Sequence, residues 1–219
     1  MATPLDHRWL NLPPAERVRE VGHRRYVGGP DAETWYGIGR LQYHFLISQG
    51  LRHDHTFLDV ACGALRLGQF LIPYLDQGRY FGLDEEPSLV MTGVKEELTP
   101  GIATLKKPNF AFNSTFNVEF ADPFDMAIAQ SLVTHMDESM VTKCLAALRK
   151  KVKPDGRFFF TFFDGDKSTN PDAPYHPNLT YRFKPEDFTP LGDQTGWSME
   201  YLGEWAHPRG QVMMVARPT

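Results

Sequence analysis

The sequence predicts an α/β fold, a doubly wound and mainly parallel sheet that ends in an antiparallel hairpin. Between residues 56 and 163, strand-like apolar runs alternate with segments of helical spacing, which is the order of a parallel sheet with helices on both faces. The strand-like runs at 198–205 and 211–217 are joined by AHPRG, whose Pro208 and Gly210 suit a turn. The length of 219 residues allows one large domain rather than two.

The first thirty residues predict an extension of the main domain, which we expect to span 31–219. They hold five arginines and the stretches PP and GGP, with one short helix predicted at 14–21. We expect a flap that packs over a pocket, with a basic RNA-binding arm as the alternative. At 31–49, Trp35, Ile38 and Phe45 follow helical spacing and Gly50 suits a helix end, so we predict an amphipathic helix with Trp35 in the core.

The alternating elements then follow in order along the chain. Strands are predicted at 56–61, 79–84, 110–116, 124–130 and 157–163, and helices at 65–75, 87–98, 137–152 and after Pro185. Right-handed crossovers place any ligand of such a sheet at the carboxyl ends of its strands. Residues 164–184 carry no such pattern, and a loop of this length predicts a lid or a substrate loop.

Composition narrows the classes of function. The formal net charge of −4, with 42% hydrophobic residues, argues against disorder and against a polyanion-binding surface, so no nucleic-acid partner is expected. Cys62 and Cys144 have no cysteine or histidine partner nearby in the sequence, so neither a disulfide scaffold nor a metal site is predicted. No secretory or membrane-spanning apolar stretch is seen, which predicts a cytoplasmic protein without a membrane partner.

The stretch FLDVACGALRLG at 57–68 is the first candidate binding loop. Asp59 ends an apolar strand, Gly63 suits a tight turn, and a ligand can reach the N–H groups at the start of the following helix. A dinucleotide-binding loop would read GxGxxG, and Ala61 and Leu65 restrict the close approach that a pyrophosphate needs. The loop therefore favours a ligand without phosphates, with a plain strand-to-helix turn as the alternative.

Asp84 ends the next strand, twenty-one positions after Gly63. A carboxylate at this point of a parallel sheet can accept both hydroxyls of a ribose. Taken alone, Asp84 has the alternative of a favourable charge at a helix N-terminus, with Glu85 and Glu86 as solvated side chains. Together with Asp59 and Gly63 it favours a nucleoside-binding site.

Four segments, LDVACGALRLG, YFGLDEEP, FDMAIAQSLVTHM and KPDGRFFFTFF, resemble in order and spacing the class I S-adenosylmethionine-dependent methyltransferases. The chain is most similar to a bacterial branch with a CGxLR loop, a QSLxxH segment and a final HPRGQ turn. The resemblance implies a Rossmann-like seven-stranded sheet. It also implies methyl transfer from S-adenosylmethionine to an oxygen or nitrogen of a small-molecule acceptor, with S-adenosylhomocysteine as the product.

The resemblance also implies a set of cofactor-binding residues, namely Asp59, Ala61, Cys62, Gly63, Arg66, Asp84, Gln130, Ser131 and Leu132. Adenine contacts are expected within 113–119. Ala61 and Leu65 replace glycines of the family's GxGxG pattern, and the second replacement suggests an early helix start that brings Arg66 to the site.

Several further residues are candidates for catalysis and for binding the acceptor. His135 is the best candidate base, because it follows the fourth strand and is neutral near pH 7, and a backbone hydrogen bond or helix cap is the equal alternative. Arg209 can bind an acceptor carboxylate, or its turn can simply stabilise the hairpin. The acceptor candidates are Tyr26, Gln42, His176, Tyr181, His207 and Arg209.

Two other functions compete with methyl transfer. An NAD-dependent reductase on a similar sheet requires phosphate-binding glycines, which are missing at 61 and 65. A protein with this fold but weak catalysis, acting as a partner or regulatory subunit, has no need to keep Asp59, Gly63 and Asp84.

Overall fold

The computed structural model describes residues 12–175 and 179–219. Its strands are β1 (Phe57–Val60), β2 (Tyr80–Asp84), β3 (Asn109–Phe112), β4 (Phe124–Ala129), β5 (Val152–Asp164), β6 (Arg182–Phe183), β7 (Trp197–Glu204) and β8 (Val212–Pro218). Its helices are α1 (Pro14–Val21), α2 (His23–Tyr26), α3 (Ala32–Ser48), α4 (Gly68–Tyr74), α5 (Pro87–Glu96), α6 (Ile102–Lys106), α7 (Glu138–Arg149) and α8 (Phe188–Thr195). Single 3₁₀ turns are η2 (Val133–His135), η3 (Lys167–Thr169) and η4 (Pro185–Asp187).

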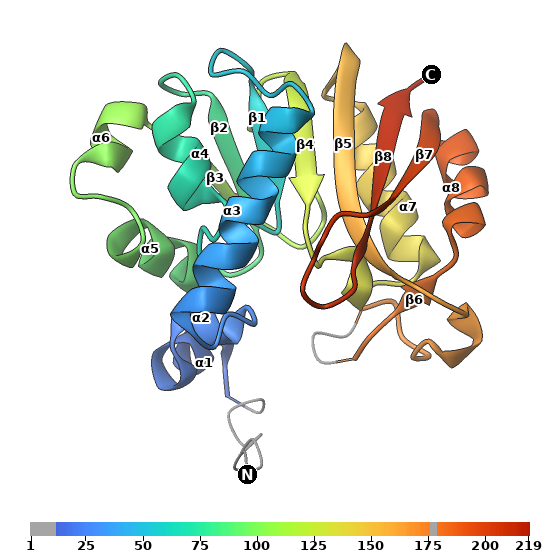
Figure 1. Cartoon of the computed structure of the whole chain (residues 1–219), viewed down its shortest axis with the longest axis horizontal. Helices are drawn as coiled ribbons and strands as arrows, with labels where there is room; N and C mark the ends of the chain where they lie inside the picture. Colours follow the sequence, from blue (N-terminus) through green and yellow to red (C-terminus); the bar gives the residue numbers. More distant parts are fainter. Residues whose placement is uncertain (1–11, 176–178) are drawn as a thin grey trace.

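The strands described here form one sheet with the order β3-β2-β1-β4-β5-β8-β7, to which β6 adds a short pairing with β5 (Figure 1). Strands β1 to β5 pair in parallel, whereas β8 pairs antiparallel with both β5 and β7. The predicted fold class is therefore confirmed, including the C-terminal hairpin. The strand order reverses between β1 and β4, and in such sheets ligands bind outside the strand ends at this point.

Alternating side chains of the strands build a core on each face of the sheet. In β1, Phe57 packs with α3 and α4 residues such as Leu46 and Leu71, while Leu58 packs on the opposite face with Val141 of α7. Figure 1 shows α3 crossing one face, with α7 and α8 covering the other. This two-sided burial explains why the parallel strands read as continuous apolar runs.

The N-terminal helices α1 and α2 lie at the end of the sheet toward which β4 points (Figure 1). Glu97, whose side chain is 1% exposed, fixes this segment in place. Its carboxylate accepts hydrogen bonds from Arg24 Nε at 2.7 Å and Trp35 Nε1 at 3.0 Å, and His23 Nε2 lies 2.5 Å away. Trp35 is fully buried, as predicted, and packs with Val18 of α1.

Several local features differ from the sequence predictions, among them the additional helix α2 and the end of β3 at Phe112 rather than at 116. Helix α4 begins at Gly68 rather than at 65, because Leu65 has a φ of +62° that no right-handed helix contains. Helix α6 was not predicted. Residues 164–184 hold η3 and β6, and Met136 forms a β-bridge with Tyr175 of this loop.

Candidate functional site

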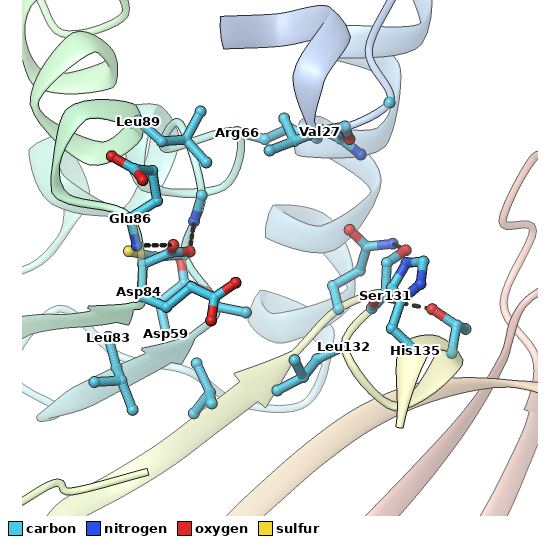
Figure 2. A pocket seen from close by; sticks show the side chains of 18 of the residues that line it. Val27, Asp59, Arg66, Leu83, Asp84, Glu86, Leu89, Ser131, Leu132 and His135 are labelled. Carbon is cyan, nitrogen blue, oxygen red and sulfur yellow. Dashed lines mark hydrogen bonds between the residues drawn. The ribbon is translucent and has the colours of Figure 1, made fainter. Parts of the chain in front are cut away.

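A cavity of about 740 Å³ opens at the carboxyl ends of β1, β2 and β4, within the range of about 300–1,000 Å³ typical of small-molecule sites. Its walls come from the loop after β1, the N-terminal segment, the loop after β4 and the β7–β8 loop. Figure 2 shows Asp59 and Asp84 on one side of this cavity, with Ser131, Leu132 and His135 across from them. The topological switch point of the sheet therefore carries the site.

The loop after β1 has the backbone shape of a glycine-rich loop, although two of its glycine positions carry side chains. Ala61, Gly63 and Leu65 have φ values of +58°, +54° and +62°. The left-handed region is uncommon for residues other than glycine, and strained backbone of this kind gathers at ligand sites. The small side chain of Ala61 lines the cavity, whereas Leu65 is fully buried in the core.

Asp84 joins this loop to the end of β2. One carboxylate oxygen accepts from the Gly63 N–H at 2.8 Å and the other from the Glu86 N–H at 3.0 Å (Figure 2). Burial nevertheless raises the pKa of Asp84 above its ordinary value, because the two N–H donors only partly offset the loss of water. Glu86 caps α5 by accepting from Ser88 N, so the alternative in which it is only a solvated side chain does not hold.

Asp59 lies deeper in the same wall, where it is 5% exposed. Its carboxylate accepts a hydrogen bond from the buried Tyr80 hydroxyl at 2.7 Å. Burial, opposed by that hydrogen bond, raises the pKa of Asp59 to about 7. This carboxyl is therefore poised to change its charge near neutral pH, according to what binds beside it.

The turn after β3, in which adenine contacts were expected, also borders the cavity. Asn113 organises it, since its Oδ1 accepts from the N–H groups of Thr115 and Asn117 at 3.2 and 2.9 Å. Ser114 and Phe116 line the cavity, and Phe116 has a left-handed φ of +57°.

The loop after β4 is held by a polar network that sequence reasoning only partly anticipated. Ser131, with a φ of +60°, donates its N–H to Thr161 Oγ1 at 2.8 Å. Gln211 Nε2 donates to Ser131 Oγ at 2.6 Å, and Gln130 Nε2 lies 3.2 Å from His207 Nε2. The QSL and HPRGQ motifs, eighty residues apart, thus meet beside the cavity.

His135 lines the cavity from η2. Its Nδ1 lies 3.1 Å from the carbonyl oxygen of Leu179. Because a carbonyl only accepts, Nδ1 carries a hydrogen in this arrangement, and in a neutral ring Nε2 is then the nitrogen without one.

Two arginines tie the N-terminal segment to the rest of the site. Arg66 donates to the carbonyl oxygen of Val27, and Arg209 donates to that of Gly28, the next residue. Arg66 is 7% exposed, lies over the Trp35 ring at 5.1 Å, and has its pKa lowered to about 10 by burial and by the charge of Arg209. Arg66 thus faces the cavity and the N-terminal segment from the turn before α4.

Two buried polar atoms beside the cavity have no hydrogen-bond partner among the described residues. They are Gln42 Oε1 and Arg66 Nε, one acceptor and one donor. Both residues line the cavity, and Gln42 is 3% exposed. Such atoms are rare in folded proteins because leaving one unsatisfied costs about 1–3 kcal/mol, so each calls for an explanation.

The structure corrects two expected acceptor contacts. Tyr181 is fully buried in the core, where its hydroxyl donates to the Ala173 carbonyl, so it does not line the cavity. His207 is also outside the lining: it stacks on Trp205 at 5.3 Å, and burial together with Arg209 lowers its pKa to about 4. Another expected acceptor contact, His176, lies outside the described residues.

The other predicted site residues all line the cavity: Tyr26, Gln42, Asp59, Ala61, Cys62, Gly63, Arg66, Asp84, Gln130, Ser131, Leu132, His135 and Arg209. Sequence reasoning missed several more, including Arg17, Val27, Leu89 and Met140. No motif marks these positions, because only the fold brings the N-terminal segment, α5 and α7 to the strand ends.

No protein-family model matches the sequence. Similar solved structures include a magnesium protoporphyrin IX methyltransferase from Synechocystis with bound S-adenosylhomocysteine, at 15% identity and a TM-score of 0.65 over 90% of this chain and 92% of that one. A TehB-like S-adenosylmethionine-dependent methyltransferase from Corynebacterium glutamicum matches at 18% identity and 0.61, over 94% and 98% of the two chains. The glycopeptide N-methyltransferase MtfA, complexed with S-adenosylmethionine, matches at 13% and 0.64, over 83% and 94%.

At these identities the likeness shows the fold, which is that of the class I S-adenosylmethionine-dependent methyltransferases. Over the described residues, no helix is long and apolar enough to cross a membrane.

Proposed function

We propose that this chain, which has the class I methyltransferase fold, transfers a methyl group from S-adenosylmethionine to an oxygen or nitrogen of a small molecule. The observation that carries this proposal is the meeting of Asp59, Gly63 and Asp84 beside the cavity, at the switch point of the sheet. The amino-acid end of S-adenosylmethionine has an ammonium group that donates and a carboxylate that accepts. Gln42 and Arg66 line the cavity, and their amide and guanidinium groups are of the kinds that would bind these two groups.

The remaining walls fit the other parts of the same molecule. A carboxylate has about four acceptor sites, and Asp84 uses two of them on backbone N–H groups, which leaves two for the hydroxyls of a ribose. Apolar side chains suited to a flat base line the same end of the cavity, namely Leu83, Leu89 and Phe116. Asp59 supplies a carboxyl that a neighbouring cation would hold in its charged form.

S-adenosylmethionine, when bound, supplies a methyl group already activated by a positively charged sulfur. The protein then has to align the acceptor, which in well-oriented systems lowers a barrier by up to ~7–11 kcal/mol. The loop that carries His135 is held in place by three contacts. The Leu179 carbonyl orients the His135 ring, Asp137 N–H donates to the Pro174 carbonyl, and Tyr181 N–H donates to the Thr134 carbonyl. We propose that Nε2 of His135 takes the proton of an acceptor that is protonated at neutral pH.

The charges of the cavity favour this function over an NAD-dependent reductase. Four carboxylates, those of Asp59, Asp84, Glu85 and Glu86, line the β1–β2 end, where a dinucleotide would place its pyrophosphate. Like charges in that position disfavour the pyrophosphate, whereas a sulfonium and an ammonium are favoured. A partner protein without catalysis is the second alternative, and it has no need of the contact between Gly63 and Asp84 that shapes this wall of the cavity.

The test uses Gln42→Met, which removes the unpartnered acceptor and keeps a side chain of similar length. We expect this variant to unfold at a higher temperature than the wild type, because it no longer buries an unsatisfied oxygen. We also expect calorimetry to show about tenfold weaker binding of S-adenosylhomocysteine. Gln49→Met is the matched control, because Gln49 is the C-cap residue of the same helix, α3, and does not line the cavity. This substitution should change neither the unfolding temperature nor the affinity for S-adenosylhomocysteine.

Failure of the wild type to bind S-adenosylhomocysteine would refute the proposal. Tight NADH binding in the same calorimeter would favour the reductase. Binding of S-adenosylhomocysteine without any methyl transfer to a broad set of phenols and amines would favour the non-catalytic partner.

A further inference from the structure

The arginines beside the cavity form a second, cationic half of the site. Arg17, Arg66 and Arg209 line it, and among the described residues none of the three forms an ion pair with a carboxylate. Each donates instead to a main-chain carbonyl, those of Leu12, Val27 and Gly28. A neutral carbonyl compensates a guanidinium only in part, so this half of the cavity is electrostatically complementary to an anion.

Arg66 and Arg209 differ in burial and in position. Arg66 is almost fully buried in the loop after β1, beside the part of the cavity assigned to the methyl donor. Arg209 is exposed, on the loop between β7 and β8, next to Gln211 and the polar network of the loop after β4. Since His135 lies on that loop, Arg209 borders the side from which an acceptor would approach.

The contact between Arg209 and the N-terminal segment depends on glycine. Gly28 has a φ of +75°, and a Cβ atom at this position would lie 2.7 Å from Arg209 Nη1. The guanidinium therefore rests directly on the backbone and uses one of its five donors on the Gly28 carbonyl. Among the described residues, the Arg209 side chain makes no other hydrogen bond, which leaves four donors for a second partner.

On the basis of the proposed function, we propose that the methyl acceptor carries an oxyanion, a carboxylate or a phosphate, and that Arg209 binds it. The planar fork of a guanidinium matches two oxygens of either group. Arg209 then faces the anionic acceptor, whereas the carboxylates of Asp59 and Asp84 face the sulfonium donor. An acceptor that is cationic throughout would be repelled by Arg209.

The experiment compares four probes that share a ring and differ in charge: para-hydroxybenzoate, para-hydroxybenzamide, phenyl phosphate and phenol. Each is titrated by calorimetry into the protein saturated with S-adenosylhomocysteine. We expect at least one anion to bind about tenfold tighter than its neutral counterpart, which is the scale of a charge-assisted pair. Whether the carboxylate or the phosphate gives the larger preference identifies the anion.

The same titrations on Arg209→Gln should abolish the preference, and Arg209→Lys should keep part of it, since lysine retains the charge but not the fork. Arg217→Gln is the matched control, because Arg217 pairs with Glu200 on β7 and does not line the cavity. The thermal midpoint of each variant shows that it is folded.

The proposal is overturned if the wild type binds neither anion more tightly than its neutral counterpart, or if Arg209→Gln keeps the preference. A wild type that fails to bind S-adenosylhomocysteine refutes the proposed function instead. In that case, titration of the protein alone with the same probes still decides whether the anion site exists.

Discussion

Restoring the two replaced glycines of the loop after β1 should have opposite effects on stability. Ala61 and Leu65 both have left-handed backbones, with φ values of +58° and +62°. Such a conformation costs a residue with a Cβ about 1–2 kcal/mol, and glycine avoids that cost while losing about 0.5–1 kcal/mol through its freer unfolded chain. Ala61→Gly should therefore be neutral or stabilise the protein by up to ~1 kcal/mol.

Leu65→Gly removes a fully buried side chain as well. Loss of a buried leucine side chain costs about 2–5 kcal/mol, against which the same relief of strain recovers about 1 kcal/mol. For a domain of this size, 1 kcal/mol corresponds to about 2–4 °C in the midpoint of thermal unfolding. We expect the midpoint of Leu65→Gly to fall by roughly 5–10 °C.

Leu65→Ala separates strain from packing. It loses nearly the same side chain but keeps a Cβ in the left-handed region, so Leu65→Gly should be the more stable of the two, the reverse of the order found in helices and strands. Urea unfolding of the three variants and the wild type measures these differences. If Leu65→Ala proves more stable than Leu65→Gly, the left-handed backbone at 65 is wrong and the reasoning fails.

Three further predictions concern the charges and the base. The pKa of Asp59 is raised to about 7 from 3.8, so its contribution to stability is complete below pH 4 and is lost as pH rises through 7. Urea unfolding should show this loss in the wild type and not in Asp59→Asn. Identical pH profiles of the two proteins would contradict the prediction. Glu97→Gln should lower the free energy of unfolding by about 2–3 kcal/mol, because a buried charge-assisted network is lost. The control Glu96→Gln changes only a surface pair with Lys95, so it should leave thermal unfolding nearly unchanged. His135→Asn keeps a donor for the Leu179 carbonyl but removes Nε2. Single-turnover methyl transfer to an acceptor that is protonated at neutral pH should therefore slow by about 10²–10⁴-fold. An unchanged rate would exclude His135 as the base.

The sequence predicts most of the sheet because its strands are short, apolar and bounded by turn residues. The convergence of Asp59, Gly63 and Asp84 is also predictable, since parallel strands bring their carboxyl ends together. The conformation of Leu65 is not predictable in this way. Its left-handed backbone runs against local preference and is held by the burial of its side chain in the core.

Long-range contacts of the candidate site lie beyond local patterns for the same reason. Arg209 meets the carbonyl of a residue 181 positions away, and Arg66 meets one 39 positions away. Tyr181 gives the opposite lesson: an aromatic residue in a loop-like stretch turns into the core once its N–H pairs with the Thr134 carbonyl. Such choices depend on tertiary contacts, which periodicity does not encode.

The carboxylates of the cavity raise a question about rate under the proposed function. The sulfonium loses its positive charge as the methyl group leaves, so a carboxylate that stabilises the cation lowers the energy of the ground state more than that of the transition state and slows the reaction. The structure limits this effect for the two buried carboxyls. Asp84 already accepts two backbone N–H groups and Asp59 accepts the Tyr80 hydroxyl, so neither turns all of its oxygen lone pairs toward the sulfonium. Their negative charge is thus partly offset before any ligand binds. The same hydrogen bonds therefore reduce both the attraction between these carboxyls and the sulfonium and the cost of that attraction to the rate.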